Sequence, residues 1–446
     1  MPNLSRRQRM PLTVFAILAL MPGSARLVAQ QTRQVSVETL IYDLKSPDAG
    51  RREAAARELG IVKYRSAIPQ LVALANDPAA SVRRAVEVTL ERMEDIQTLP
   101  GFIAFASDAE DDIRSRAVDA LVNVHLPRAA GVAAALTNIR ERIVYRPNRD
   151  LEVIVEPDVP VDPAVVSTLR ARIGDSVRGI RHTAIRGLGI LRARPAVPDL
   201  VRVVREDRDD GLRFDAVRAL RKIGDTSIAD DLLALLNIND DAVRSELIAT
   251  LASMRHRGAV PELTRIAEQN RRADAACVLA LAALADLADP SSGPLFDRLK
   301  ADEDEMVRLY ANEGIARTSD ANMRTQISAA RLVEKSARVR TAQAFGLLRL
   351  GASEYLDELI RALERSSTRD LAKEYLLETR GADRQALFAP RSVSAGARAE
   401  LADVLGLIGD PDALPRLQEM AHDSDKDVAR AAERAARRIA VASSSQ

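Results

Sequence analysis

The chain has 446 residues, of which 47% are hydrophobic but only 3% aromatic, and its formal net charge is +1. A compact core rarely holds more than about 250–300 residues, so this length indicates several domains or an array of repeats. The near-neutral charge offers no basic surface of the kind that binds nucleic acid or an anionic membrane, and a single cysteine excludes an intrachain disulfide and a metal site built from several cysteines.

The first 29 residues have the pattern of a signal peptide. Arg6, Arg7 and Arg9 precede a short apolar run at 12–21, and small residues suited to cleavage follow it. The run is about half as long as a membrane-spanning helix. We therefore expect export to a periplasmic or extracellular location, with a membrane anchor or a buried first helix as the alternatives.

From residue 30 onward, one pattern recurs with a period of about 31 residues, which is typical of a helical hairpin. Its second helix, here called the B helix, starts with an aliphatic residue that Arg usually follows; Ala or an aliphatic residue comes four positions later and Leu eight positions later. This spacing gives a helix with one narrow apolar stripe. The starts of the B helices are Arg51, Val82, Ile113, Ile180, Leu212, Val243, Ala276, Val307, Val339, Leu371, Ala397 and Val428.

Another amphipathic segment, the A helix, precedes each B helix. In four units it opens alike, as in Ala67-Ile68-Pro69-Gln70-Leu71, and proline is tolerated there because its missing N–H would be unpaired in a first helical turn anyway. In most turns between the two helices, an Asp five residues before the start can cap the B helix. Four glycines are predicted to end B helices, namely Gly60, Gly189, Gly224 and Gly351.

The proline of the A helix, the Asp turn and the Val-Arg-x-x-Ala start of the B helix resemble HEAT repeats, specifically those of the bilin-lyase type. The resemblance covers residues 36–440 and implies an all-α fold, an α-solenoid of about twelve HEAT-like helical hairpins. Cys277 and Ala429 stand where the Arg is expected, and a 26-residue spacing around Gly381 predicts a shortened or distorted unit.

The period is broken between Ile113 and Ile180, which lie 67 residues apart, so we place an insertion at 126–161. Two runs of β-branched residues around a Pro-Asn-Arg-Asp turn predict one small β-hairpin there. An insertion that the array does not need for stability is a natural place for binding, or else a tolerated surface decoration. The candidate partner-binding residues are Arg142, Tyr145, Arg146 and Arg149.

The chain thus divides into a signal peptide at 1–29, repeats 1–3 at 30–125, the insertion at 126–161, repeats 4–12 at 162–440 and a polar tail at 441–446. We expect the Arg after each B-helix start to pair with the turn Asp of its own or of the next repeat, with a ladder for acidic ligands as the alternative. Exposed pairs contribute at most about 1 kcal/mol each, so they would fix register. These structural positions are Asp77, Arg83, Asp108, Arg114, Asp175, Arg181, Asp207, Arg213, Asp302 and Arg308.

No catalytic or metal-binding pattern stands out. The four histidines are far apart, and none begins an HExxH motif or precedes a Glu, as in the iron-binding pairs of HEAT-type hydroxylases. The segment at Asp423 opens like a calcium loop but has Val428 where that loop needs glycine, which favours helix capping. Cys277 lies among small apolar residues and is predicted to pack rather than to react. We predict no cofactor and no catalytic residue.

These features predict an exported, non-enzymatic scaffold or adaptor that binds a protein or peptide on the concave face of the solenoid. The alternative is a lyase or chromophore-handling factor, which the resemblance to bilin-lyase repeats implies; export and the lack of a convincing nucleophile weigh against it. Nucleic-acid binding fits poorly with the neutral charge, and no membrane span is expected.

Overall fold

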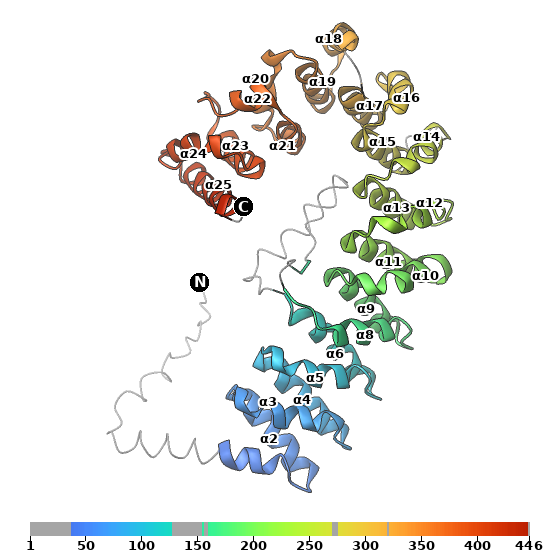
Figure 1. Ribbon diagram of the computed structural model, residues 1–446, viewed down its shortest axis with the longest axis vertical. Helices are drawn as coiled ribbons and strands as arrows, with labels where there is room; N and C mark the ends of the chain where they lie inside the picture. Colours follow the sequence, from blue (N-terminus) through green and yellow to red (C-terminus); the bar gives the residue numbers. More distant parts are fainter. Residues whose placement is uncertain (1–36, 127–153, 156–158, 270–274, 319–320, 445–446) are drawn as a thin grey trace, which may run out of the picture. The chain divides into compact units, whose positions relative to one another are not determined.

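The computed structural model describes residues 37–126, 154–155, 159–269, 275–318 and 321–444, most of them helical. They fall into two compact units, the first made of the described residues up to Leu200 and the second of those from Val201 onward. Figure 1 shows helices following one another in pairs along each unit. Each unit is therefore a stack of helical hairpins.

In the first unit, short A helices alternate with longer B helices. Neighbouring B helices contact one another, since α2 packs on α4 and α6 on α9. The stack of B helices therefore continues across the 126–161 segment. The A helices are α3 (Ile68–Ala73), α5 (Leu99–Phe105) and α8 (Pro163–Arg172), and the B helices are α2 (Ala49–Ile61), α4 (Ala80–Met93), α6 (Asp111–Asn123) and α9 (Arg178–Ile190).

The second unit continues the alternation, and α10 (Val197–Glu206) leads into it. Its A helices are α12 (Ala229–Leu233), α14 (Val260–Gln269), α16 (Gly293–Leu299), α18 (Arg324–Val333), α20 (Leu356–Ala362), α22 (Gly381–Ala386) and α24 (Leu414–Met420). Its B helices are α11 (Asp210–Ile223), α13 (Asp241–Ser253), α15 (Ala275–Leu287), α17 (Glu305–Thr318), α19 (Ala337–Arg349), α21 (Arg369–Leu377), α23 (Ala395–Ile408) and α25 (Lys426–Ser444). The unit expected to be shortened near Gly381 contains α22, which has six residues. This A helix is as long as α3 and longer than the five-residue α12, so the A helix itself is not shortened.

The predicted repeat is confirmed within the described residues, because a helix covers each of the twelve predicted B-helix starts. All of these starts from Val82 to Val428 are buried, whereas Arg51 is exposed. The apolar stripe of each B helix is thus the core of its hairpin. None of the helices in these ranges combines the length and apolarity needed to cross a bilayer.

Two of the four predicted glycine stops are correct. Gly224 and Gly351 adopt the left-handed conformation, with φ of 69° and 87°, just after α11 and α19. The prediction is wrong for Gly60 and Gly189, because α2 and α9 run through them. At Gly60 a Cβ would lie 2.7 Å from Thr89 Oγ1 of α4, so this glycine permits close helix contact. The left-handed turn comes later, at Lys63 and Arg192.

The predicted β-hairpin is not confirmed. Most of residues 126–161 lie outside the described residues, and the described part of that segment contains no strand. Val155 instead donates its N–H to the carbonyl of Ile190 at the end of α9 (2.9 Å).

Candidate functional site

In the first unit, the Arg after the B-helix start joins its own turn to the next turn. Arg83 Nη1 donates to the carbonyl of Asp77 in its own turn (3.0 Å). Its Nε and Nη2 donate to the two carboxylate oxygens of Asp108 in the next turn (2.6 and 2.8 Å). Arg52 forms the same bidentate pair with Asp77 (2.7 and 2.9 Å). Such charge-assisted pairs have fixed geometry, so they set the register of successive repeats, and we call them ladder pairs.

A ladder pair also spans the insertion. Arg114 donates to the carbonyl of Asp108 (2.8 Å) and to both carboxylate oxygens of Asp175 (3.1 and 3.3 Å). The two side chains are only 9% and 3% exposed. The 126–161 segment therefore separates these partners in sequence without separating them in space.

The turn Asp residues lie two residues before the N-cap of the B helix. Asp108 accepts the N–H of Glu110 (2.9 Å), the residue that precedes the first turn of α6. Burial by itself raises the pKa of the Asp108 carboxyl, but the hydrogen bonds from Arg83 and from the Glu110 N–H outweigh burial and lower it. The carboxylate is therefore held ionised between two repeats, and the prediction that it caps the B helix directly is wrong.

Ladder pairs recur in the second unit. Arg398 binds Asp423 (2.8 and 2.9 Å), and Arg308 binds Glu334 (3.0 and 3.3 Å). Glu334 occupies the position five residues before a B-helix start, where the predicted pattern included only Asp. A search for either acid at that position would have found it.

The other predicted ladder residues make contacts close to their own turns. Arg181 donates to the carbonyl of the preceding turn Asp (3.0 Å), and Arg213 donates to the carbonyl of Val204 (3.1 Å). Asp207 and Asp302 each accept the backbone N–H two residues further on (2.8 and 2.9 Å).

Arg340 of α19 has the same register but no side-chain hydrogen bond or ion pair among the described residues. In the ladder pairs with consecutive repeats, the acid follows the Arg by 25 or 26 residues. The corresponding positions after Arg340 hold Arg365 and Ser366, so neither of them supplies a carboxylate. Glu364, the acid of that turn, instead accepts the N–H of Ser394 (3.0 Å).

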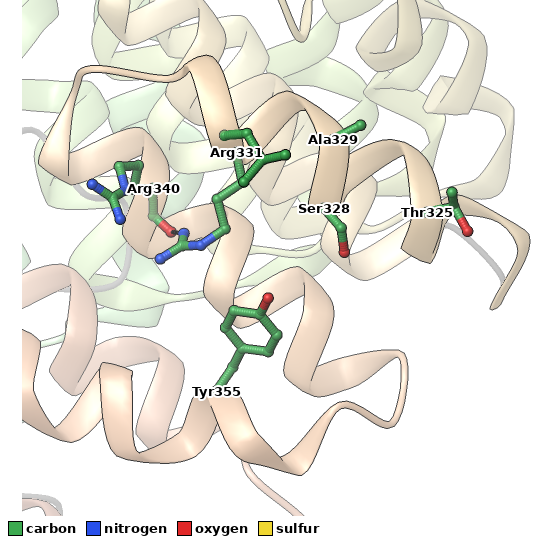
Figure 2. A pocket seen from close by; sticks show the side chains of 7 residues that line it. Thr325, Ser328, Ala329, Arg331, Arg340 and Tyr355 are labelled. Carbon is green, nitrogen blue, oxygen red and sulfur yellow. Dashed lines mark hydrogen bonds between the residues drawn. The ribbon is translucent and has the colours of Figure 1, made fainter.

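Arg340 lines a groove of about 560 Å³ together with residues of α18 and Tyr355, and we call this the α18 groove. Figure 2 shows Thr325 and Ser328 along α18, with the Tyr355 hydroxyl directed toward that helix. Leu332 at the end of α18 also lines it and is 87% exposed. The groove thus combines an unpaired cation, hydroxyl groups and an exposed aliphatic side chain.

Arg331 fixes one side of the α18 groove. Its guanidinium donates to the carbonyl of Arg340 and to Glu358, and it lies 5.5 Å from the centre of the Tyr355 ring. Because Arg331 already has these partners, the unpaired positive charge of the groove belongs to Arg340.

A second feature, the Arg317 cluster, joins successive B helices of the second unit. Its members are Asp286 of α15, Glu313 and Arg317 of α17, Phe345 and Arg349 of α19, Tyr375 of α21 and Glu378, which follows α21. The repeat pattern did not predict this cluster, although Asp286, Arg317 and Arg349 each lie ten residues after a B-helix start.

Arg317 is the centre of this cluster. It contacts carboxylate oxygens of Glu378 (2.6 Å), Asp286 (3.4 Å) and Glu313 (3.6 Å). Burial by itself would lower the pKa of the guanidinium, but the charges of Glu313, Glu378 and Asp286 raise it. Arg317 therefore remains a buried cation with several acidic neighbours.

Aromatic rings complete the Arg317 cluster. The rings of Phe345 and Tyr375 stack with centroids 4.3 Å apart, and the guanidinium groups of Arg317 and Arg349 lie 5.6 and 5.7 Å from the Phe345 centroid. Tyr375 donates its O–H to Glu313. The side chain of Arg349 is about a third exposed, so the cluster has a buried centre and a charged rim.

The first unit contains a buried carboxyl group without a hydrogen-bond partner. Glu87 of α4 is 1% exposed, and neither of its carboxylate oxygens forms a hydrogen bond within the part of the chain that the structure describes. Burial raises the pKa of Glu87 to about 8, against the opposing charge of Arg116. Val118 and Ile185 occupy the equivalent position in α6 and α9, so Glu87 stands where these neighbouring B helices of the first unit have an apolar residue.

His125 and the single cysteine are enclosed by the fold. His125 is buried and its Nδ1 lies 2.9 Å from the carbonyl of Leu121, and Cys277 is 3% exposed. Among the described residues, no three or more His, Cys, Asp or Glu side chains are grouped so as to hold a metal ion. The candidate binding residues Arg142, Tyr145, Arg146 and Arg149 lie outside the described residues.

Family comparison agrees with this architecture. The model of HEAT repeats matches residues 37–136, 160–221 and 206–282, which together make up half of the chain. The chain belongs to the HEAT-repeat family. The model of the PBS lyase HEAT-like repeat matches residues 397–423, so the repeat extends close to the end of the described residues.

A curated relative of this HEAT-repeat protein is the uncharacterized phycocyanin operon protein Z of Pseudanabaena tenuis. It is 24% identical over 219 residues, which cover 49% of this chain and 93% of the relative.

Similar solved structures include an engineered protein (17% identity, TM-score 0.38, covering 91% of this chain and 99% of that one). Another is the complex of CpcE and CpcF of phycocyanin lyase from Nostoc sp. (17% identity, TM-score 0.36, covering 61% and 94%). With scores this low, the fold assignment rests on the helical hairpins and the family match.

Proposed function

We propose that this protein is an exported, non-catalytic scaffold that binds a protein or peptide partner through the B helices of its second unit. The observation that carries the proposal is the Arg317 cluster. It places Asp286, Arg349 and Glu378, which are about a quarter to a third exposed, around a nearly buried Arg317.

This arrangement supports binding for two physical reasons. Protein interfaces are enriched in Arg and aromatic residues at their centre and have a polar rim. The rim charges are also held in place before a partner arrives, because Arg349 lies over Phe345 and contacts Glu378 (3.3 Å). Side chains that are already ordered lose less entropy on binding.

Site-specific photo-crosslinking tests this proposal. A photoreactive residue at position 349, in the native host, is expected to capture a discrete partner, and Glu378→Lys in the same chain should abolish that capture. Position 430, whose Arg is 67% exposed on α25, is the matched control. Identical products from both positions, or capture that survives Glu378→Lys, would contradict a binding role for the cluster.

Export rests on the sequence pattern of residues 1–29, and a fusion tests it. Joined to a phosphatase that is active only outside the cytoplasm, this segment should confer activity, and replacement of Arg6, Arg7 and Arg9 by Glu should reduce it. Equal activity of the two fusions would argue against an export signal.

The likeness to the phycocyanin operon protein favours a second candidate, a lyase or chromophore-handling factor. In that case the protein, produced together with a phycocyanin subunit and its bilin, should purify with a visible absorption band or increase pigment attachment. Cys277→Ala separates a thiol-dependent reaction from simple binding. A colourless protein that leaves pigment attachment unchanged would remove this candidate.

A further inference from the structure

The ladder pairs show what Arg340 lacks. At Arg308, one repeat earlier, the guanidinium is bound by Glu334 of the next turn. After Arg340, the matching turn positions hold Arg365 and Ser366. The guanidinium of Arg340 is therefore in register to receive a carboxylate that its own chain does not supply.

The surroundings of Arg340 favour the same kind of ligand. The hydroxyl groups of Thr325, Ser328 and Tyr355 line the α18 groove, and none of them is hydrogen-bonded to another described residue. All of these groups can donate hydrogen bonds. The nearby carboxylate of Glu358 is bound by Arg331, so the groove presents hydrogen-bond donors to which no described residue supplies an acceptor.

An apolar surface adjoins these donors. Leu332 and Val333 are 87% and 79% exposed at the end of α18, and Leu332 lines the groove. A free inorganic anion would leave these side chains in water. A peptide can supply a carboxylate, backbone carbonyls and an aliphatic side chain together.

A groove in the first unit provides the contrast. It has a volume of about 340 Å³ and is lined by Asp108, Arg114 and Asp175, among others. There the charges bind one another, because Arg114 is paired with Asp175. The α18 groove differs because its ladder position is incomplete.

We propose that the α18 groove binds an acidic, leucine-containing peptide segment of a partner protein, whose carboxylate takes the place of the missing turn acid on Arg340. The aliphatic side chain of the segment covers Leu332, and its carbonyls accept hydrogen bonds from the groove hydroxyls. The proposal deepens the proposed scaffold function and rests on it, but it uses residues outside the Arg317 cluster.

Fluorescence anisotropy with two labelled peptides tests the site on the full mature chain. One peptide alternates Leu with Asp and the other alternates Leu with Asn. Wild type should bind the Asp peptide about tenfold more tightly, since one carboxylate–guanidinium pair in a groove is worth roughly that factor. Arg340→Glu should remove the preference, and Leu332→Asp should weaken binding.

The Arg340→Lys variant and a distant control make the result specific. Arg340→Lys should keep part of the preference, because lysine retains the charge but not the bidentate geometry. Arg430→Glu makes the same charge change on α25 and should leave binding intact. Helical circular dichroism verifies that each variant is folded.

Equal affinity for the two peptides, or equal losses in Arg340→Glu and Arg430→Glu, would overturn the proposal. Competition by inorganic phosphate as effective as that of the Asp peptide would also overturn it, because it would show an anion site without peptide recognition. If these tests fail while the capture at position 349 persists, the proposal of peptide binding in the α18 groove is wrong and the proposed scaffold function is unaffected.

Discussion

Replacing Glu87 by Gln should stabilise α4 increasingly as the pH rises. The pKa of Glu87 in the folded protein is about 8, compared with an ordinary value of 4.5. Because the folded state holds the proton more tightly, this group lowers stability progressively as the pH rises from about 4.5 to about 8. At about 1.36 kcal/mol per pH unit, the loss of folding stability caused by Glu87 at pH 7 is at most about 3 kcal/mol, and partial solvation of the carboxylate reduces it to about 2 kcal/mol. Glutamine fills the same space without a charge.

Native-state hydrogen exchange of residues 80–93 measures this effect locally, because a repeat array need not unfold in one step. Wild type and Glu87→Gln should differ little at pH 5, and the variant should be better protected at pH 7 and still more at pH 9. Glu91→Gln changes an exposed residue of the same helix. Because the charge of Glu91 contributes less than burial to the raised pKa of Glu87, this variant should stay much closer to wild type than Glu87→Gln does. A difference between wild type and Glu87→Gln that stays constant from pH 5 to pH 9 would contradict a raised pKa of Glu87 in the folded protein.

Three further predictions concern the stability and reactivity of the array. Arg83→Ala should lower the free energy of unfolding, measured by urea denaturation, by about 2–3 kcal/mol because it leaves a nearly buried carboxylate unpaired. Arg84→Ala breaks exposed pairs and should lower it by less than about 1 kcal/mol. Equal losses in the two variants would contradict a structural role for the ladder pairs. Gly406→Ala places a Cβ 2.7 Å from backbone of α25 and should lower the melting temperature, while Gly396→Ala meets nothing within 4 Å and should not; the two melting curves would coincide if the contact were unimportant. The thiol of Cys277, 3% exposed, should react with a thiol reagent only after denaturation, and rapid reaction of the native protein would be inconsistent with its packing.

The repeat could be predicted from the sequence because its signal is local and recurs. Each B helix carries its stripe within a few turns, and the buried starts such as Val82 and Ile113 follow directly from that spacing. The ends of the helices were harder to predict. Gly60 is a glycine near the end of a B helix, where a helix stop is expected. Its role instead depends on its closeness to Thr89 of another helix, which cannot be read from the sequence.

The candidate site depended even more on distant contacts. Tyr375 and Glu313 lie 62 residues apart and share one hydrogen bond, and each alone looks like an ordinary residue of an amphipathic helix. Arg340 has the same place in its B helix as the arginines of the ladder pairs. It differs from them only because the partner positions in the next turn, Arg365 and Ser366, carry no carboxylate. The candidate residues Arg142, Tyr145, Arg146 and Arg149, by contrast, could be chosen from the sequence, but the structure does not describe them.

The ladder pairs give each array a direction. In every pair the guanidinium belongs to the earlier repeat and the carboxylate to the later one, as with Arg83 and Asp108. When whole repeats are removed or duplicated, each Arg still faces an equivalent acid in the next repeat. When only part of a repeat is removed, one Arg or one acid loses its partner. Arg114 and Asp175 show that length can also change freely between donor and acceptor. The protein can therefore grow or shrink in evolution by whole repeats or within such a connecting segment, and other changes of length break the register.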